Sequence, residues 1–149
     1  MNSLLGPGSA ALAAGLLACG GTAACDGLRA DGGWLRQPPP GAGSAAGYVL
    51  LMNAGDRPMT VRGVSSPAFA RGMIHETRYS EGRAEMRHLH EIVIAPGAQI
   101  EARPGGMHLM LSEPKQPLAL GDMIEIHFDC ASGDPLITWL PVRRTAPDS

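Results

Sequence analysis

The chain has 149 residues, of which 44% are hydrophobic and 17% charged, and its formal net charge is −2. These values are typical of one folded domain with extensions; they exclude a disordered polyelectrolyte and give no electrostatic reason to expect nucleic-acid binding. Aromatic residues are only 4%, so aliphatic side chains must fill the core, and the eight methionines exceed what a core needs. Twenty glycines and 13 prolines predict many turns between short elements.

Residues 1–25 are typical of an export segment, with an apolar stretch too short to span a bilayer as a helix. The sequence LLACG around Cys19 resembles a lipobox, which makes Cys19 the candidate lipid anchor. Residues 22–24 are an alternative cleavage site, directly before Cys25. Residues 2–15 contain no Lys or Arg, in contrast to the positive start of most signal peptides.

After the export segment the sequence predicts an extended lead-in followed by strands. Residues 26–45 are expected to be an extended lead-in, because the prolines at 38–40 cannot donate hydrogen bonds to a sheet. Alternating or continuous apolar runs predict strands within 48–53, 59–64, 69–79, 90–94, 99–102, 106–111, 123–128 and 136–142. No helix of convincing length is found, so residues 46–144 are predicted to form an all-β sandwich or barrel, followed by a short tail at 145–149.

One set of residues points to a metal. Ten residues separate His75 from Met86, 21 separate Met86 from His108, and Leu109 alone separates His108 from Met110. Thioether sulfur selects Cu(I), and imidazole accepts copper readily. Neither group has to lose a strongly held proton near neutral pH. His108 and Met110 are two residues apart and face the same way on an extended chain.

This spacing closely resembles the H-x10-M-x21-H-x-M signature of the PCuAC family of periplasmic copper chaperones. Further similarity lies at residues 33–36 (GWLR), 46–48 (AGY), 96–97 (PG), 104–111 (PGGMHLML) and 120–122 (LGD). The resemblance covers residues 33–144. It implies a cupredoxin-like Greek-key β-sandwich that binds Cu(I) in the periplasm. It also implies delivery toward the CuA domain of cytochrome oxidase, alongside a Sco-type thiol chaperone.

Further donors lie close in sequence. Met73 has the same strand parity as His75 and is a candidate secondary ligand. His88 and His90 are candidates for a second, weak Cu(II) site, since Cu(II) prefers nitrogen donors; the alternative is that both are exposed loop histidines. Met107 is expected to point away from His108, because adjacent strand residues face opposite ways.

Cys25 and Cys130 form an even pair if Cys19 belongs to the export segment, and an exported chain can then hold one disulfide. Such a bridge would tie the N-terminus to the sandwich. If Cys25 is instead the lipidated residue, Cys130 is free. There is no Cys-x-x-Cys, so thiol-disulfide exchange is not the expected function.

The function classes can be narrowed. No nucleophile triad, phosphate loop or informative carboxylate pair is found, so we expect no enzymatic activity. A blue-copper electron carrier needs a Cys ligand, and none lies near the His and Met set. A Cu(I) carrier remains, with membrane contact only through an anchor at Cys19. The alternatives are a periplasmic copper buffer or resistance protein without a specific acceptor, and a β-sandwich interaction module.

Overall fold

The computed structural model describes residues 25–131 and 133–147, so the export segment and Cys19 lie outside the described residues, Cys25 excepted. Within that part the chain forms ten strands, and no helix there could cross a membrane. The strands are β1 (Leu28–Arg36), β2 (Ser44–Asn53), β3 (Met59–Ser65), β4 (Phe69–Ser80), β5 (Arg83–Leu89), β6 (Ile92–Ile94), β7 (Gln99–Ala102), β8 (Met107–Pro114), β9 (Met123–Cys130) and β10 (Leu136–Arg143).

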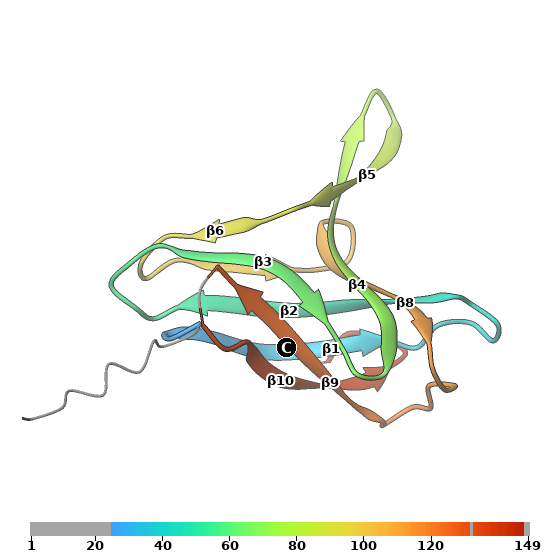
Figure 1. Ribbon diagram of the computed structural model, residues 1–149. Helices are drawn as coiled ribbons and strands as arrows, with labels where there is room; N and C mark the ends of the chain where they lie inside the picture. Colours follow the sequence, from blue (N-terminus) through green and yellow to red (C-terminus); the bar gives the residue numbers. More distant parts are fainter. Residues whose placement is uncertain (1–24, 132, 148–149) are drawn as a thin grey trace, which may run out of the picture.

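The strands form two layers (Figure 1). One layer runs in the order β5-β4-β8-β2-β1, and β7 also pairs with β2; the other runs β10-β9-β3-β6. A short parallel pairing of β1 with β10, at Leu35↔Val142 and Arg36↔Arg143, connects them. Neighbours in space are mostly not neighbours in sequence, as in a Greek key. The predicted all-β, cupredoxin-like sandwich is confirmed.

Side chains from both layers fill one core. Ile74 of β4 and Leu109 and Leu111 of β8 are buried with Ile126 and Phe128 of β9, all at 1% exposure or less. One face of the β4–β8 part of the sheet therefore packs on the core. The residues that alternate with these apolar ones face away from the core.

Two segments differ from the sequence-based expectation. The lead-in at 26–45 contains strand β1, in which Trp34 and Leu35 are buried, so the folded domain begins before residue 46. A register shift between Asp31 and Trp34, at a pair of glycines, interrupts the alternation that would have revealed it. Strand β5 lies between the strands predicted at 69–79 and 90–94 and was not itself predicted; nearly all of its side chains are exposed, so no buried face marks it in the sequence.

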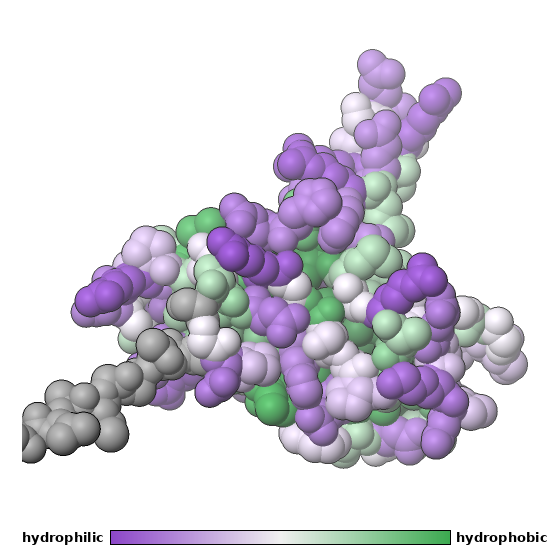
Figure 2. All heavy atoms as spheres, in the orientation of Figure 1, coloured by the Kyte–Doolittle hydropathy of each residue, from purple (hydrophilic) through white to green (hydrophobic). Residues whose placement is uncertain are grey.

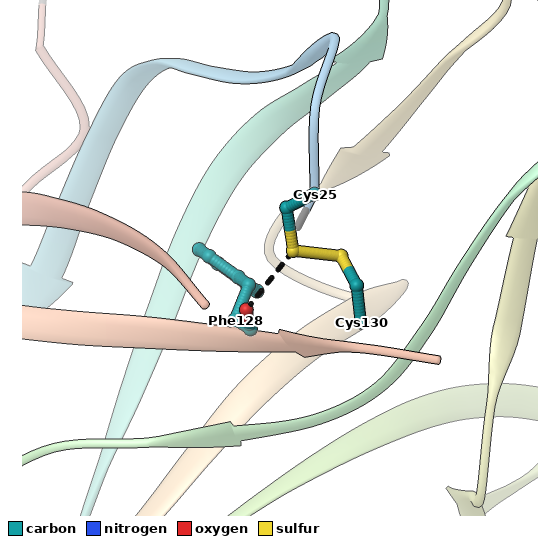
Figure 3. Close-up of a disulfide and its surroundings, with 3 residues drawn as sticks. All are labelled: Cys25, Phe128 and Cys130. Carbon is teal, nitrogen blue, oxygen red and sulfur yellow. Dashed lines mark hydrogen bonds between the residues drawn. A yellow bond between two sulfur atoms is a disulfide. The ribbon is translucent and has the colours of Figure 1, made fainter. Parts of the chain in front are cut away.

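Cys25 and Cys130 are joined by a disulfide with a Cα–Cα distance of 5.5 Å (Figure 3). The sulfur of Cys25 lies 3.4 Å from the carbonyl oxygen of Phe128; a bridged sulfur has no hydrogen to donate, so this is a packing contact. The bridge fastens the start of the described chain to the end of β9. Of the alternatives left open by the sequence, lipidation of Cys25 with a free Cys130 is not the arrangement in this structure.

Candidate metal-binding site

The pairing of β4 with β8 brings the first site residues together. His75 lies directly opposite His108, and Met73 lies directly opposite Met110. Ile74, between Met73 and His75 on β4, and Leu109, between His108 and Met110 on β8, are both buried in the core. Because side chains alternate along a strand, these four side chains share the side of the sheet that faces away from the core. We call this side of β5, β4 and β8 the histidine–methionine face.

Strand β5 adds Met86 and His88 to the same face. His88 pairs with His75, and Met86 pairs with Thr77, two residues further toward the hairpin tip. The hairpin turns at Glu81 and Gly82, whose φ values of 50° and 75° are those of the tight turns that favour two-residue hairpins. All four ligand positions identified in the sequence are thus placed on one side of three adjacent strands.

The β4–β5 hairpin projects from the body of the sandwich (Figure 1). In the space-filling view its tip is hydrophilic, whereas its base is paler and more apolar (Figure 2). Met86 is 59% exposed, in contrast to His108 at 6%. The face therefore runs from a sheltered end on β8 to an open end on β5, where another protein could reach it.

The His108 imidazole is oriented by the backbone. Its Nδ1 lies 3.0 Å from the carbonyl oxygen of Gly106. A carbonyl only accepts, so Nδ1 carries the hydrogen and donates it, and the lone pair of Nε2 is left for a metal. Gly105, with φ of 78°, and the hydrogen bond from the Gly106 amide to the carbonyl of Arg103 form the turn that sets this carbonyl in place. Gly106 is a positioning residue that the sequence analysis missed, although the Pro-Gly-Gly turn two residues before His108 marked its place.

His75 has no such partner. Its Nδ1 is buried and makes no hydrogen bond with the residues that the structure describes. Burial lowers the pKa of His75 below its usual value, and the neighbouring imidazoles of His108 and His88 lower it further. The ring is therefore neutral at neutral pH, which is the form that binds a metal.

The donor types limit which metal fits. The ring centroids of His75 and His108 are 5.8 Å apart, at 88° to each other. Within the described residues, no three His, Cys, Asp or Glu side chains are already grouped as a metal site. A site on this face must therefore use thioether sulfur or gather its imidazoles by side-chain rotation. Sulfur and neutral nitrogen without carboxylate match copper far better than zinc, calcium or magnesium.

The other nitrogen and sulfur donors lie either at the histidine–methionine face or away from it. Met73 and His88 lie on the histidine–methionine face, and His90 follows β5 with its ring centroid 4.4 Å from that of His88. Met107 pairs with Glu76 and packs against the core, on the opposite side of β8. His127 lies in the other layer and is hydrogen-bonded to Glu125 at 2.6 Å, apart from the site.

Comparison with known proteins agrees with this fold. A copper-bound PCuAC domain from PmoF2 matches with a TM-score of 0.67 and 23% identity, over 80% of this chain and 94% of that one. Cu(I)-loaded DR1885 of Deinococcus radiodurans matches with a TM-score of 0.61 and 28% identity, over 76% of each chain. The apo form of DR1885 matches over 97% of this chain and 95% of that one, with a TM-score of 0.62 and 25% identity.

Sequence comparison gives the family. A protein of Leifsonia xyli subsp. xyli (strain CTCB07), "Putative lipoprotein Lxx21020", is 28% identical over 119 residues, which are 79% of this chain and 70% of that protein. Residues 28–142 match the family model described as "Putative lipoprotein LpqE-like". The resemblance to the PCuAC family is confirmed by the structural neighbours, whereas the four ligand positions remain a prediction. The chain belongs to the LpqE-like family and has the fold of PCuAC domains.

Proposed function

We propose that this chain binds Cu(I) on its histidine–methionine face and carries the ion to an acceptor protein. The observation that supports this most directly is the pairing of β4 with β8, which sets His75 opposite His108 and Met73 opposite Met110. The proposed ligands are the imidazole nitrogens of His75 and His108 and the thioether sulfurs of Met86 and Met110. Cu(I)-loaded DR1885, with 28% identity to this chain, supports copper as the cargo.

The chemistry of the donors suits a carrier. All four proposed ligands are neutral, so binding a monovalent soft ion requires little proton release and leaves no excess negative charge. His108 is sheltered and oriented by Gly106, whereas Met86 is exposed on the projecting hairpin. An incoming ligand from an acceptor can therefore replace Met86 first, while the remaining donors still hold the ion. Transfer by such ligand exchange needs no catalytic group, and we expect no enzymatic activity.

The acceptor and the compartment are part of the proposal. We propose delivery toward the CuA domain of cytochrome oxidase, directly or through a Sco-type thiol chaperone. The disulfide between Cys25 and Cys130 supports an oxidising compartment such as the periplasm. The lipoprotein descriptions of the family and of the Leifsonia protein support anchoring to a membrane, for which Cys19 is the candidate.

A titration of the full chain with Cu(I), in competition with a Cu(I) chelator, tests the binding. We expect one copper per chain, with X-ray absorption that reports both nitrogen and sulfur neighbours. A shell of nitrogen and oxygen only, or no copper held against the chelator, would overturn the proposed site and move the interaction-module alternative forward.

Carrier and buffer are separated by kinetics. The Cu(I)-loaded chain is mixed with an apo CuA domain, and transfer is followed by the CuA absorption that appears after oxidation. A carrier should transfer copper faster than its spontaneous release to a chelator, because the acceptor displaces the ligands directly. Transfer no faster than that release would favour a copper buffer without a specific acceptor.

A further inference from the structure

Four of the five histidines in the chain lie at or beside the histidine–methionine face, and the proposed Cu(I) site uses only two of them. His108, His75 and His88 occupy directly paired positions on β8, β4 and β5. His90 follows β5 next to His88. The row thus adds two further nitrogen donors, His88 and His90, at the end of β5 where the hairpin joins the sandwich.

The spacing of these rings is compatible with a shared ion. Two imidazoles that bind one ion at metal–nitrogen distances of about 2.0 Å have ring centroids about 4–6 Å apart. The centroids of His88 and His90 are 4.4 Å apart, and those of His75 and His88 are 5.7 Å apart. The three rings are not yet grouped as a metal site. His88 and His90 are both exposed, so their side chains can rotate toward His75.

His75 stands at the centre of the row and has an unused nitrogen. Its Nδ1 is buried without a hydrogen-bond partner in the described part of the chain. Its ring is flanked on one side by His108, at 5.8 Å, and on the other by His88, at 5.7 Å, between centroids. His75 can therefore join the donors on either side.

We propose that His75, His88 and His90 form a second copper site, specific for Cu(II), which shares His75 with the Cu(I) site. Cu(II) prefers nitrogen donors, whereas Cu(I) accepts thioether sulfur. The sulfur-containing set uses Met110 of β8 and Met86 of β5, whereas the nitrogen-only set uses His75 of β4 with His88 and His90 at the C-terminal end of β5. This inference rests on the proposed function only through the shared residue, His75, since Cu(II) binding can be measured on its own.

The two sites are separated by paired variants of the full chain. Cu(II) sulfate is titrated in air and followed by electron paramagnetic resonance; Cu(I) affinity is measured anaerobically against a chelator. The double variant His88→Gln with His90→Gln should weaken Cu(II) binding by about tenfold or more and leave Cu(I) affinity within about twofold. Met110→Leu should weaken Cu(I) binding by about tenfold or more and leave Cu(II) affinity within about twofold. His75→Gln should weaken both.

His127→Gln is the matched control, because His127 lies in the other layer and is hydrogen-bonded to Glu125. Neither the Cu(I) nor the Cu(II) affinity of this variant should change. Nitrogen hyperfine structure in the wild-type spectrum and its loss in the double variant are the expected signature. Unchanged Cu(II) affinity in the double variant, or no Cu(II) bound by the wild type, would overturn the second site while leaving Cu(I) binding intact. If the wild-type chain does not bind Cu(I), that result would instead count against the proposed function.

Discussion

Gly72 of β4 lies against the backbone of Val64 of β3, so close that a Cβ at position 72 would overlap the Val64 carbonyl. The same Cβ would lie 3.3 Å from Cδ2 of Leu111. Val64 belongs to one layer of the sandwich and Gly72 to the other. This contact therefore sets how closely β4 approaches the opposite layer, one residue before Met73 on the histidine–methionine face.

Gly72→Ala should consequently destabilise the fold by about 1–3 kcal/mol, as overpacking of a core does, and should also weaken Cu(I) binding because β4 has to move. Chemical unfolding measures the first effect and chelator competition the second. Gly43→Ala is the control, since nothing lies within 4 Å of a Cβ at that position. If Gly72→Ala is as stable as Gly43→Ala, the close approach of β4 to β3 is not a constraint on the fold.

Met110 and Met107 offer a matched pair on one strand. Both are half-buried on β8, but Met110 pairs with Met73 on the histidine–methionine face and Met107 packs against the core. Replacement by Leu keeps the apolar volume and removes the sulfur. Met110→Leu should lower Cu(I) affinity by about tenfold or more, whereas Met107→Leu should leave it within about twofold.

Met86→Leu extends the same comparison to the hairpin, and Cu(I) affinity should fall there as well. Chelator competition measures all three variants, and thermal unfolding checks that each remains folded. Equal affinities for the Met110 and Met107 variants would show that sulfur on this face does not bind the ion.

The sequence indicated that the four proposed ligand positions converge, and the strand pairing places them on one face of the sheet. The spacing of His75, Met86, His108 and Met110 pointed to convergence, and strand alternation placed His108 and Met110 on one side of β8. Alternation could do this because Leu109, which lies between His108 and Met110, is apolar and buried.

What the sequence did not reveal depends on register and on exposed strands. The pairing of His75 with His88 is set by the turn at Glu81 and Gly82, where a non-glycine residue has a positive φ. A strand exposed on both sides, such as β5, carries no hydrophobic period to recognise. Strand β1 could not be predicted for a different reason: its register shifts between Asp31 and Trp34, which interrupts the alternation of buried and exposed residues.

Removal of the disulfide should separate stability from metal binding. Cys25 and Cys130 are 105 residues apart in sequence. A bridge that closes a loop of this length stabilises the fold by up to about 4–5 kcal/mol in the chain-entropy account. The double variant Cys25→Ser with Cys130→Ser should therefore unfold at a lower denaturant concentration and keep its Cu(I) affinity, since neither residue lies on β4, β5 or β8. A variant as stable as the wild type would show that the bridge contributes little to the folded domain.

The apo protein should lose stability as the pH falls through about 6.5, the ordinary pKa of the imidazole. Burial lowers the pKa of His75 in the folded chain, and the facing imidazoles of His108 and His88 lower it further. The unfolded chain therefore takes up a proton at a pH where folded His75 still resists it, which favours unfolding. Above the unfolded pKa both states are neutral, and no such penalty exists. Urea unfolding of the metal-free protein between pH 5 and 8 measures the slope, which His75→Gln should reduce and His127→Gln should not. A slope unchanged by His75→Gln would mean that the pKa of His75 is not lowered on folding.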